Sequence, residues 1–88
     1  MQLNVSSRLK RSYKRLPRLL QADFDRKVQL FVADQFDQKL RTHKLKGKLQ
    51  ECHAFCLRDG FRVLFEFVSN VEVNLLDVGP HNKYDRWG

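Results

Sequence analysis

The stretch FRVLFEFVSNVEVNLLDVGP, residues 61–80, decides the fold of this chain. Together with ECHAFCL just before it, it contains three runs rich in β-branched and aromatic residues, a composition typical of strands. The runs cover residues 51–57, 61–68 and 71–78. Asp59-Gly60 separates the first two runs and Ser69-Asn70 the last two, and both pairs favour tight hairpin turns. We therefore predict three consecutive strands joined by hairpins.

Alternation along the central run predicts which face of this sheet is buried, because successive strand side chains point to opposite faces. The expected core face carries Phe61, Val63, Phe65 and Phe67, and the other face carries Arg62, Leu64 and Glu66.

The length of the hairpin loop decides where the preceding strand places His53. A two-residue loop at Asp59-Gly60 pairs His53 with Glu66 on the polar face, whereas a three-residue loop pairs it with Phe65 on the core face. Only the longer loop also turns the two apolar side chains at 55 and 57 toward the core. We therefore expect the three-residue loop, with His53 buried rather than catalytic.

The residues before these strands predict one short strand and two helices. Residues 2–5 suit a strand, Ser6 or Ser7 can cap a helix, and Pro17 ends it. The apolar positions of this first helix are Leu9, Tyr13 and Leu16, and its outer face is cationic, with Arg8, Lys10, Arg11, Lys14 and Arg15.

A second helix is predicted from about residue 17 to about residue 34. Its buried stripe is expected to contain Leu20, Phe24, Val28, Phe31 and Val32, with Asp23, Asp25, Arg26 and Lys27 outside. Residues 35–49 are interpreted as a linker that breaks at Gly47.

This order of elements predicts an α+β fold, β-α-α-β-β-β, in one domain spanning residues 1–88. We expect a small sheet of about four strands, mainly antiparallel, packed on one side against the N-terminal helical hairpin.

The charge of the chain is unevenly placed. Lys and Arg outnumber Asp and Glu by 17 to 10, a net charge of +7. Residues 1–48 carry thirteen cations against four carboxylates, while residues 49–88 carry four against six. A strongly basic half favours a polyanionic partner such as nucleic acid.

The cysteines and the hydropathy favour a cytoplasmic protein without membrane segments. Cys52 and Cys56 stand four apart in a predicted strand, about 13 Å at roughly 3.3 Å per residue, too far for a disulfide. The first ten residues lack an apolar signal segment, and no stretch approaches the roughly 18 apolar residues of a membrane span.

Three motifs, in order, resemble the RelE/ParE superfamily of toxin–antitoxin toxins. They are Leu45–Leu49 (LKGKL), Phe61-Arg62-Val63 on the central strand, and Val78-Gly79-Pro80-His81 closing at Tyr84. The resemblance covers nearly the whole chain. It implies a cognate antitoxin protein as partner. In its RelE and YafQ-like branch it implies cleavage of mRNA on the ribosome, by attack of the RNA's own 2′-hydroxyl without a metal. The ParE branch instead implies inhibition of DNA gyrase.

The resemblance places three residues in the catalytic site. Arg62 can fork two N–H donors onto a phosphate, although a structural salt bridge to Glu66 or Glu72 is the alternative. His81 can act as general acid or base, and otherwise is a surface-loop histidine. Tyr84 either positions a nucleotide or simply packs.

A row of cations before the sheet is expected to hold RNA backbone together with the first helix: Arg41, Lys44, Lys46 and Lys48. The chain departs from the family at three positions. Ala54 and Cys56 stand where RelE has lysines, and Asp77 stands where a YafQ-like toxin has arginine. A lysine-driven mechanism is therefore excluded, and activity depends on Arg62 and His81.

No cofactor is expected. A zinc site built from Cys52, His53, Cys56 and His81 is disfavoured because both cysteines fall within one strand. Two rival functions stay open. One is a ParE-like toxin without nuclease activity, and the other is an inert relative that only binds an antitoxin or regulates transcription.

Overall fold

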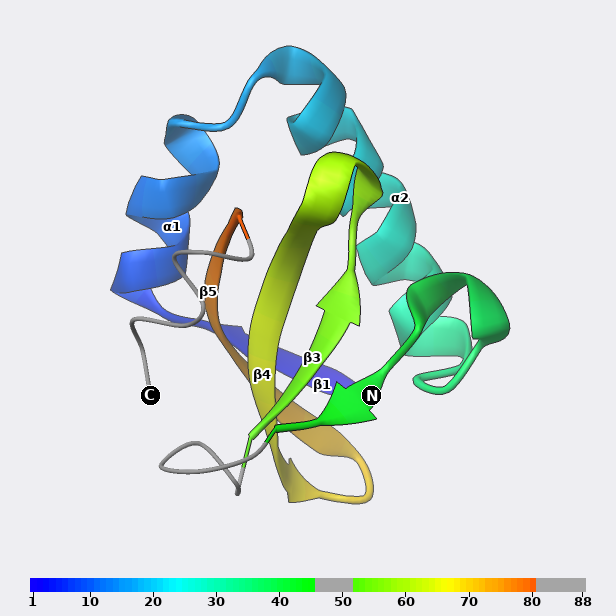
Figure 1. Ribbon diagram of the computed structural model, residues 1–88. Coiled ribbons are helices and arrows are strands. Elements are labelled where there is room, and N and C mark those ends of the chain that lie inside the picture. The colour runs from blue at the N-terminus through cyan, green and yellow to red at the C-terminus, as the bar shows by residue number, and fades with distance from the viewer. Residues whose placement is uncertain (46–51, 81–88) are drawn as a thin grey trace.

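The computed structural model describes residues 1–45 and 52–80, which form a mixed sheet with two helices on one face (Figure 1). The described strands are β1 (Gln2–Val5), β2 (His43–Lys44), β3 (His53–Cys56), β4 (Phe61–Ser69) and β5 (Glu72–Pro80). Their order across the sheet is β1-β5-β4-β3-β2, with β1 parallel to β5 and the other pairs antiparallel. The predicted α+β class and mainly antiparallel sheet are confirmed.

The described sheet has five strands rather than about four, because the predicted linker at 35–49 contains β2. Here His43 pairs with Ala54 and Lys44 with His53. Two residues are too few to show an alternating pattern, so the sequence could not reveal this strand. The same stretch holds a 3₁₀ helix, η1 (Gln38–Leu40), which buries Leu40 completely. The predicted break at Gly47 lies outside the described residues.

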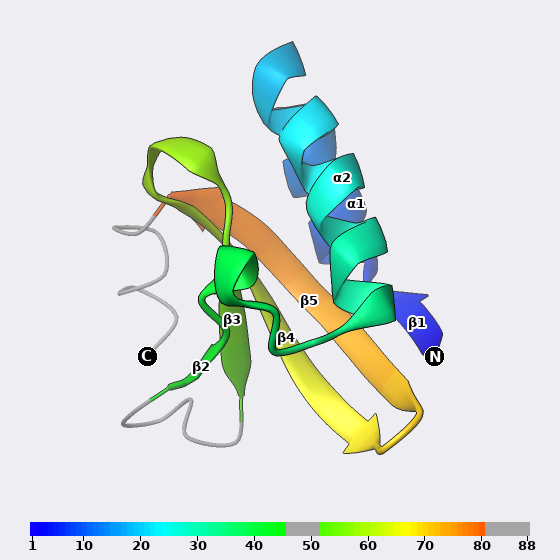
Figure 2. The same cartoon turned by 90° about the vertical axis from the view of Figure 1, so that its right-hand side faces the viewer.

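Two helices, α1 (Ser7–Lys14) and α2 (Arg18–Ala33), cover the same face of the sheet (Figure 2). Ser6 caps α1: its hydroxyl accepts a hydrogen bond from the Leu9 N–H at 3.0 Å and donates to the Leu76 carbonyl at 2.6 Å. Pro17 lies between the helices, as predicted. Within the described part of the chain, neither helix is long and apolar enough to cross a membrane.

The main core lies between these helices and the sheet, centred on Phe31. Its side chain is 0% exposed, and its ring centroid lies 5.0 Å from that of Phe55 and 4.8 Å from that of Phe65. Around it pack Leu9, Leu16, Leu20, Phe24, Leu40, Leu57, Val63, Val73, Leu75 and Val78. A smaller cluster contains Leu45, Cys52, Ala54 and Leu64.

Two predicted positions on α2 are wrong. Val32 was expected in the buried stripe but is 42% exposed, because it follows Phe31 by one residue and is turned about 100° away around the helix. Asp23 was expected outside but is only 4% exposed. Its burial depends on contacts with the β3–β4 loop, which are described below.

A β-bulge in β5 adjusts the sheet to its core. Leu64 of β4 pairs with Asp77, while the next residue, Phe65, pairs with Leu75, so Leu76 is extra. Leu75 and Val78 both reach the main core although three positions separate them, and a regular strand would turn them to opposite faces. The bulge therefore allows both Leu75 and Val78 to face the main core.

The buried carboxylate of Asp77 holds α1 against this bulge. Its Oδ1 accepts hydrogen bonds from the Ser12 hydroxyl at 2.6 Å and from the Val78 N–H at 2.8 Å. Its Oδ2 lies 3.4 Å from the Arg8 Nε. Asp77 thus has a structural role in joining α1 to β5.

Phe31→Ala should lower the free energy of unfolding by about 3–5 kcal/mol, because it empties the centre of the core. Phe36→Ala is the matched control, since Phe36 is 64% exposed and stacks on Phe67 at the surface with ring centroids 6.1 Å apart. Urea unfolding followed by circular dichroism measures both. Equal losses in the two variants would contradict the placement of Phe31 at the core centre.

Candidate functional site

A pocket of about 400 Å³ opens between α2, η1 and the β3–β4 loop. Five of its lining residues are cationic: Lys27 on α2, Lys39 on η1, Arg41, Arg58 in the loop and Arg62 on β4. We call it the cationic pocket. Among the lining residues of this pocket that the structure describes, the only carboxylate is Asp59, whose Oδ2 lies 3.4 Å from the Arg58 Nε. The excess of positive charge favours an anionic ligand in this pocket.

Arg62 enters this pocket from the middle of the sheet. It is half-buried on β4, between Cys56 of β3 and Gly79 of β5. The two carboxylates considered as its structural partners accept hydrogen bonds from asparagines. Asn74 donates to Glu66 at 3.0 Å and Asn4 to Glu72 at 2.7 Å. Arg62 is one of the residues that line the cationic pocket.

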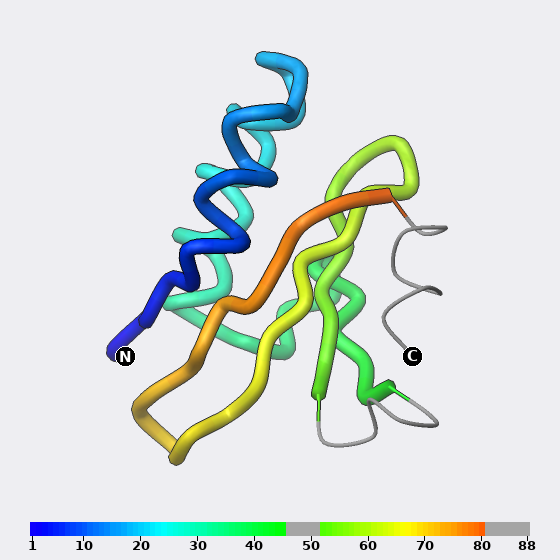
Figure 3. The backbone as a smooth tube through the Cα atoms, turned by 90° about the vertical axis from the view of Figure 1, so that its left-hand side faces the viewer, coloured from blue at the N-terminus to red at the C-terminus, as the bar shows by residue number. Residues whose placement is uncertain are grey.

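The loop beside Arg62 is the three-residue version predicted for the hairpin. The Leu57 N–H donates to the Phe61 carbonyl at 2.7 Å, leaving η3 (Arg58–Gly60) between them. Asp59 and Gly60 are both left-handed, with φ of 59° and 76°. This conformation suits glycine and is tolerated by aspartate. The loop and the β4–β5 turn lie at opposite ends of the molecule (Figure 3).

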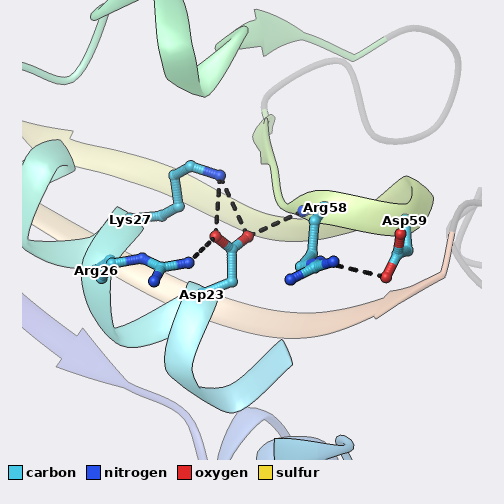
Figure 4. Close-up of polar contacts among 5 residues, drawn as sticks. All are labelled: Asp23, Arg26, Lys27, Arg58 and Asp59. Carbon is cyan, nitrogen blue, oxygen red and sulfur yellow. Dashed lines mark hydrogen bonds and ion pairs between the residues drawn. The ribbon is translucent and has the colours of Figure 1, made fainter. Parts of the chain in front are cut away.

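Asp23 joins this loop to α2 (Figure 4). Its carboxylate accepts hydrogen bonds from the Arg58 backbone N–H at 2.9 Å, from the Arg26 guanidinium at 3.0 Å and from the Lys27 ammonium at 3.2 Å. Burial by itself raises the pKa of Asp23, but these donors and the charge of Lys27 outweigh it and hold the pKa below its ordinary value. Asp23 is therefore ionised at neutral pH.

The other predicted RNA-binding residues are only partly brought together. Arg41 is exposed and lines the cationic pocket, while Lys44 is exposed on β2 opposite His53. The cationic face of α1 is exposed at every predicted position: Arg8, Lys10, Arg11, Lys14 and Arg15. Lys46, Lys48, His81 and Tyr84 lie outside the described residues.

Three of the cations that line the pocket were not assigned to the site from sequence. Lys27 was predicted on the outer face of its helix, whereas Lys39 falls in the predicted linker and Arg58 in the predicted hairpin loop. The one available signal was the position of Arg58 next to the Asp59-Gly60 turn, close to Arg62 in the hairpin. Of the family departures, Ala54 is fully buried and Cys56 faces Arg62 across the strand pair. In the described part of the chain, Cys52 and Cys56 form no disulfide.

His53 is half-buried and pairs with Phe65, as expected from the longer loop. Its ring stacks on Phe65 at 5.7 Å and meets the edge of Phe67 at 5.1 Å between centroids. In the described residues its Nδ1 is buried without a hydrogen-bond partner. Burial, and then the positive charges of Lys44 and His43, lower the pKa of His53 below its ordinary value. The packing of His53 against aromatic rings gives it a structural role.

The free energy of unfolding should fall in the wild type as pH drops below about 6.5, the pKa of an unfolded histidine. The unfolded chain then binds a proton that folded His53 resists, and the loss continues down to the lowered folded pKa. His53→Gln should flatten this part of the profile. Urea midpoints between pH 7.5 and 5 measure it, and parallel profiles for the two proteins would exclude His53 as the cause.

Both the sequence and this arrangement of sheet and helices can be compared with known proteins. No protein-family model and no curated protein matches the sequence. The fold, however, is similar to that of solved toxins. A YoeB/ParE toxin from Agrobacterium tumefaciens has a TM-score of 0.76 and 13% identity over 92% of this chain and 99% of that one. The chain has the RelE fold.

Two further structures show how far the RelE fold extends along the chain. A chain of the RelB–RelE antitoxin–toxin complex from Methanococcus jannaschii has a TM-score of 0.74 and 14% identity, covering 97% of this chain and 99% of that one. The isolated E. coli RelE toxin has a TM-score of 0.68 and 18% identity, covering 99% and 98%. Because the sequence identities are low, these similarities establish the fold alone. They do not establish the chemistry of the site.

Proposed function

We propose that this protein is the toxin of a type II toxin–antitoxin system and a metal-independent endoribonuclease that cleaves mRNA on the ribosome. The observation that carries the proposal is the cationic pocket, which gathers Arg62 and four other cations on a RelE fold. Its volume of about 400 Å³ lies in the range of small-molecule pockets and suits a nucleotide with its phosphate.

The proposed reaction uses the RNA as its own nucleophile. The 2′-oxygen attacks the adjacent phosphorus while the bond from phosphorus to the 5′-oxygen breaks, which leaves a 2′,3′-cyclic phosphate and a free 5′-hydroxyl. Arg62 stabilises the added negative charge on the phosphate. His81 takes the proton of the 2′-hydroxyl or gives one to the leaving 5′-oxygen. Tyr84 positions the nucleotide.

The pairing at the end of β5 supports the inclusion of His81. Pro80, the residue before His81, pairs with Phe61, and Gly79 pairs with Arg62. The chain therefore reaches position 81 from a residue that lies beside the strand of Arg62. Arg41, Lys44, Lys46, Lys48 and the cationic face of α1 are proposed to hold the RNA backbone by charge.

An antitoxin protein is the proposed partner that restrains this activity in the cytoplasm. Among the structural neighbours, the RelE toxins of E. coli and M. jannaschii are seen in complexes with RelB. Because the first 48 residues carry the excess positive charge, the segment of the antitoxin that binds them is proposed to be acidic and amphipathic.

A second candidate function is a ParE-like toxin that binds DNA gyrase, or an inert relative that only binds an antitoxin. The specific observation in its favour is the chemistry of β3 beside Arg62. Ala54 is fully buried and Cys56 carries a thiol, so these two positions supply no lysine to the pocket. The next two experiments separate this candidate from the nuclease.

Arg62→Ala should slow mRNA cleavage by about 100-fold to 1,000-fold, the usual effect of removing one preorganised charge donor from a transition state. Cleavage on translating ribosomes measures this, and thermal unfolding checks the fold. Arg18→Ala, at the exposed start of α2, removes the same charge and should leave cleavage unchanged. A large drop in the melting temperature of Arg62→Ala, with loss of antitoxin binding, would identify Arg62 as a structural residue instead.

His81→Gln should reduce cleavage by about 10² to 10⁴, because glutamine keeps similar volume and hydrogen bonding but cannot carry a proton at neutral pH. The wild-type rate should bend near pH 6.5, the ordinary histidine pKa, and the variant rate should not. Full toxicity of His81→Gln, with no mRNA cleavage by either protein, would favour the gyrase-binding candidate.

A further inference from the structure

Asp23 is a buried carboxylate at the edge of a pocket that is otherwise rich in cations. We propose that Asp23 is a positioning residue of the cationic pocket, which fixes the Arg58 loop and the Lys27 ammonium so that the pocket can hold an RNA phosphodiester. The inference rests on the proposed function for its ligand. It deepens that function by naming a residue outside the predicted site, Asp23, as the one that holds the walls of the pocket in place.

Asp23 first connects α2 to the β3–β4 loop through a hydrogen bond. Asp23 Oδ2 accepts the hydrogen bond of the Arg58 N–H at 2.9 Å, across 35 positions of sequence. The two residues after Arg58 are left-handed, a conformation that is uncommon for residues other than glycine, and one of them is Asp59. A hydrogen bond from outside the loop therefore stabilises a backbone that local preference alone does not favour.

Asp23 also contacts the opposite wall of the pocket. The ammonium of Lys27 lies 3.2 and 3.3 Å from the two carboxylate oxygens of Asp23, and its side chain is only 21% exposed. Asp23 supplies a charged hydrogen-bond partner for this half-buried ammonium. Arg26, which also pairs with Asp23, is 71% exposed and remains largely hydrated. Asp23 therefore fixes the position of the Lys27 ammonium at the pocket wall.

One carboxylate thus contacts both walls, Lys27 on the helix side and Arg58 on the loop side (Figure 4). Because of this arrangement, the proposal predicts a change in RNA affinity opposite in direction to the change expected from charge alone. By charge alone Asp23 repels a phosphate, so its removal should strengthen binding of RNA. If Asp23 positions the walls, its removal should weaken binding although the pocket becomes more positive.

The experiment compares Asp23→Asn with Asp25→Asn, which removes the same charge two residues along α2. Asp25 is a suitable control because it is exposed and accepts its hydrogen bonds from the Tyr13 hydroxyl at 3.0 and 3.2 Å. The probe is a short single-stranded RNA with 2′-O-methyl groups, which cannot cleave itself. Asp23→Asn should bind it about tenfold more weakly, while Asp25→Asn should bind it equally or more tightly.

The salt dependence of the same binding adds a readout that a merely destabilised fold would not move. The slope of log affinity against log salt should become shallower by about 0.7 for each phosphate that Asp23→Asn no longer neutralises, and stay unchanged in Asp25→Asn. If Asp23→Asn binds as tightly as Asp25→Asn with the same slope, the positioning role is overturned. If the Arg62→Ala variant also binds like the wild type, the proposed function fails with it.

A measurement on the wild type keeps the test independent of the stability of Asp23→Asn. The Arg58 amide should exchange its hydrogen slowly, because it is bonded to a buried carboxylate. If the Arg58 amide hydrogen instead exchanges as fast as one in an unstructured loop, the proposed hydrogen bond between α2 and the loop is wrong, whatever the variants show.

Discussion

The packing of Phe31 against Phe55 and Phe65 is the contact on which the rest of this structure depends. Its ring lies within 5.0 Å of both partner centroids and brings the second half of α2 down onto β3 and β4. Because a helix is rigid over a few turns, this contact also determines where the preceding turns of α2 lie. Asp23 and Lys27 reach the β3–β4 loop for that reason, so an aromatic contact in the core sets the geometry of a polar pocket at the surface.

The order of elements and the buried faces could be predicted from the sequence because burial acts directly on side-chain pattern. The apolar residues of β4 alternate, and Leu9 and Leu16 recur at helical spacing, so their faces are determined locally. The longer hairpin loop was predictable for the same reason, since only one register turns Phe55 and Leu57 inward. Such patterns need no knowledge of distant parts of the chain.

The polar part of the candidate site was predicted less well because it depends on distant partners. Asp23 is typical of an exposed helical position, but in the structure it contacts another element, where it accepts a hydrogen bond from the Arg58 N–H. Lys27 and Lys39 likewise reach the pocket from two different elements, a helix and a 3₁₀ helix. The relative position of these two elements cannot be predicted from local sequence patterns. Arg62 was identified because strand parity and a family resemblance agreed on it. Its catalytic role, like that of His81 and Tyr84, stays a prediction.

The parallel pairing of β1 with β5 constrains the order in which the chain can fold. Gln2 pairs with Glu72 and Val5 with Leu75, and the Ser6 hydroxyl bonds the Leu76 carbonyl. During synthesis the N-terminal strand therefore has no partner until residues 72–76 have left the ribosome, and closing so long a loop is slow. The strand and the first helix, whose Ser12 bonds Asp77, dock late. Until then the nascent chain has an unpaired sheet edge at β5, a surface on which chaperones or a second chain can act.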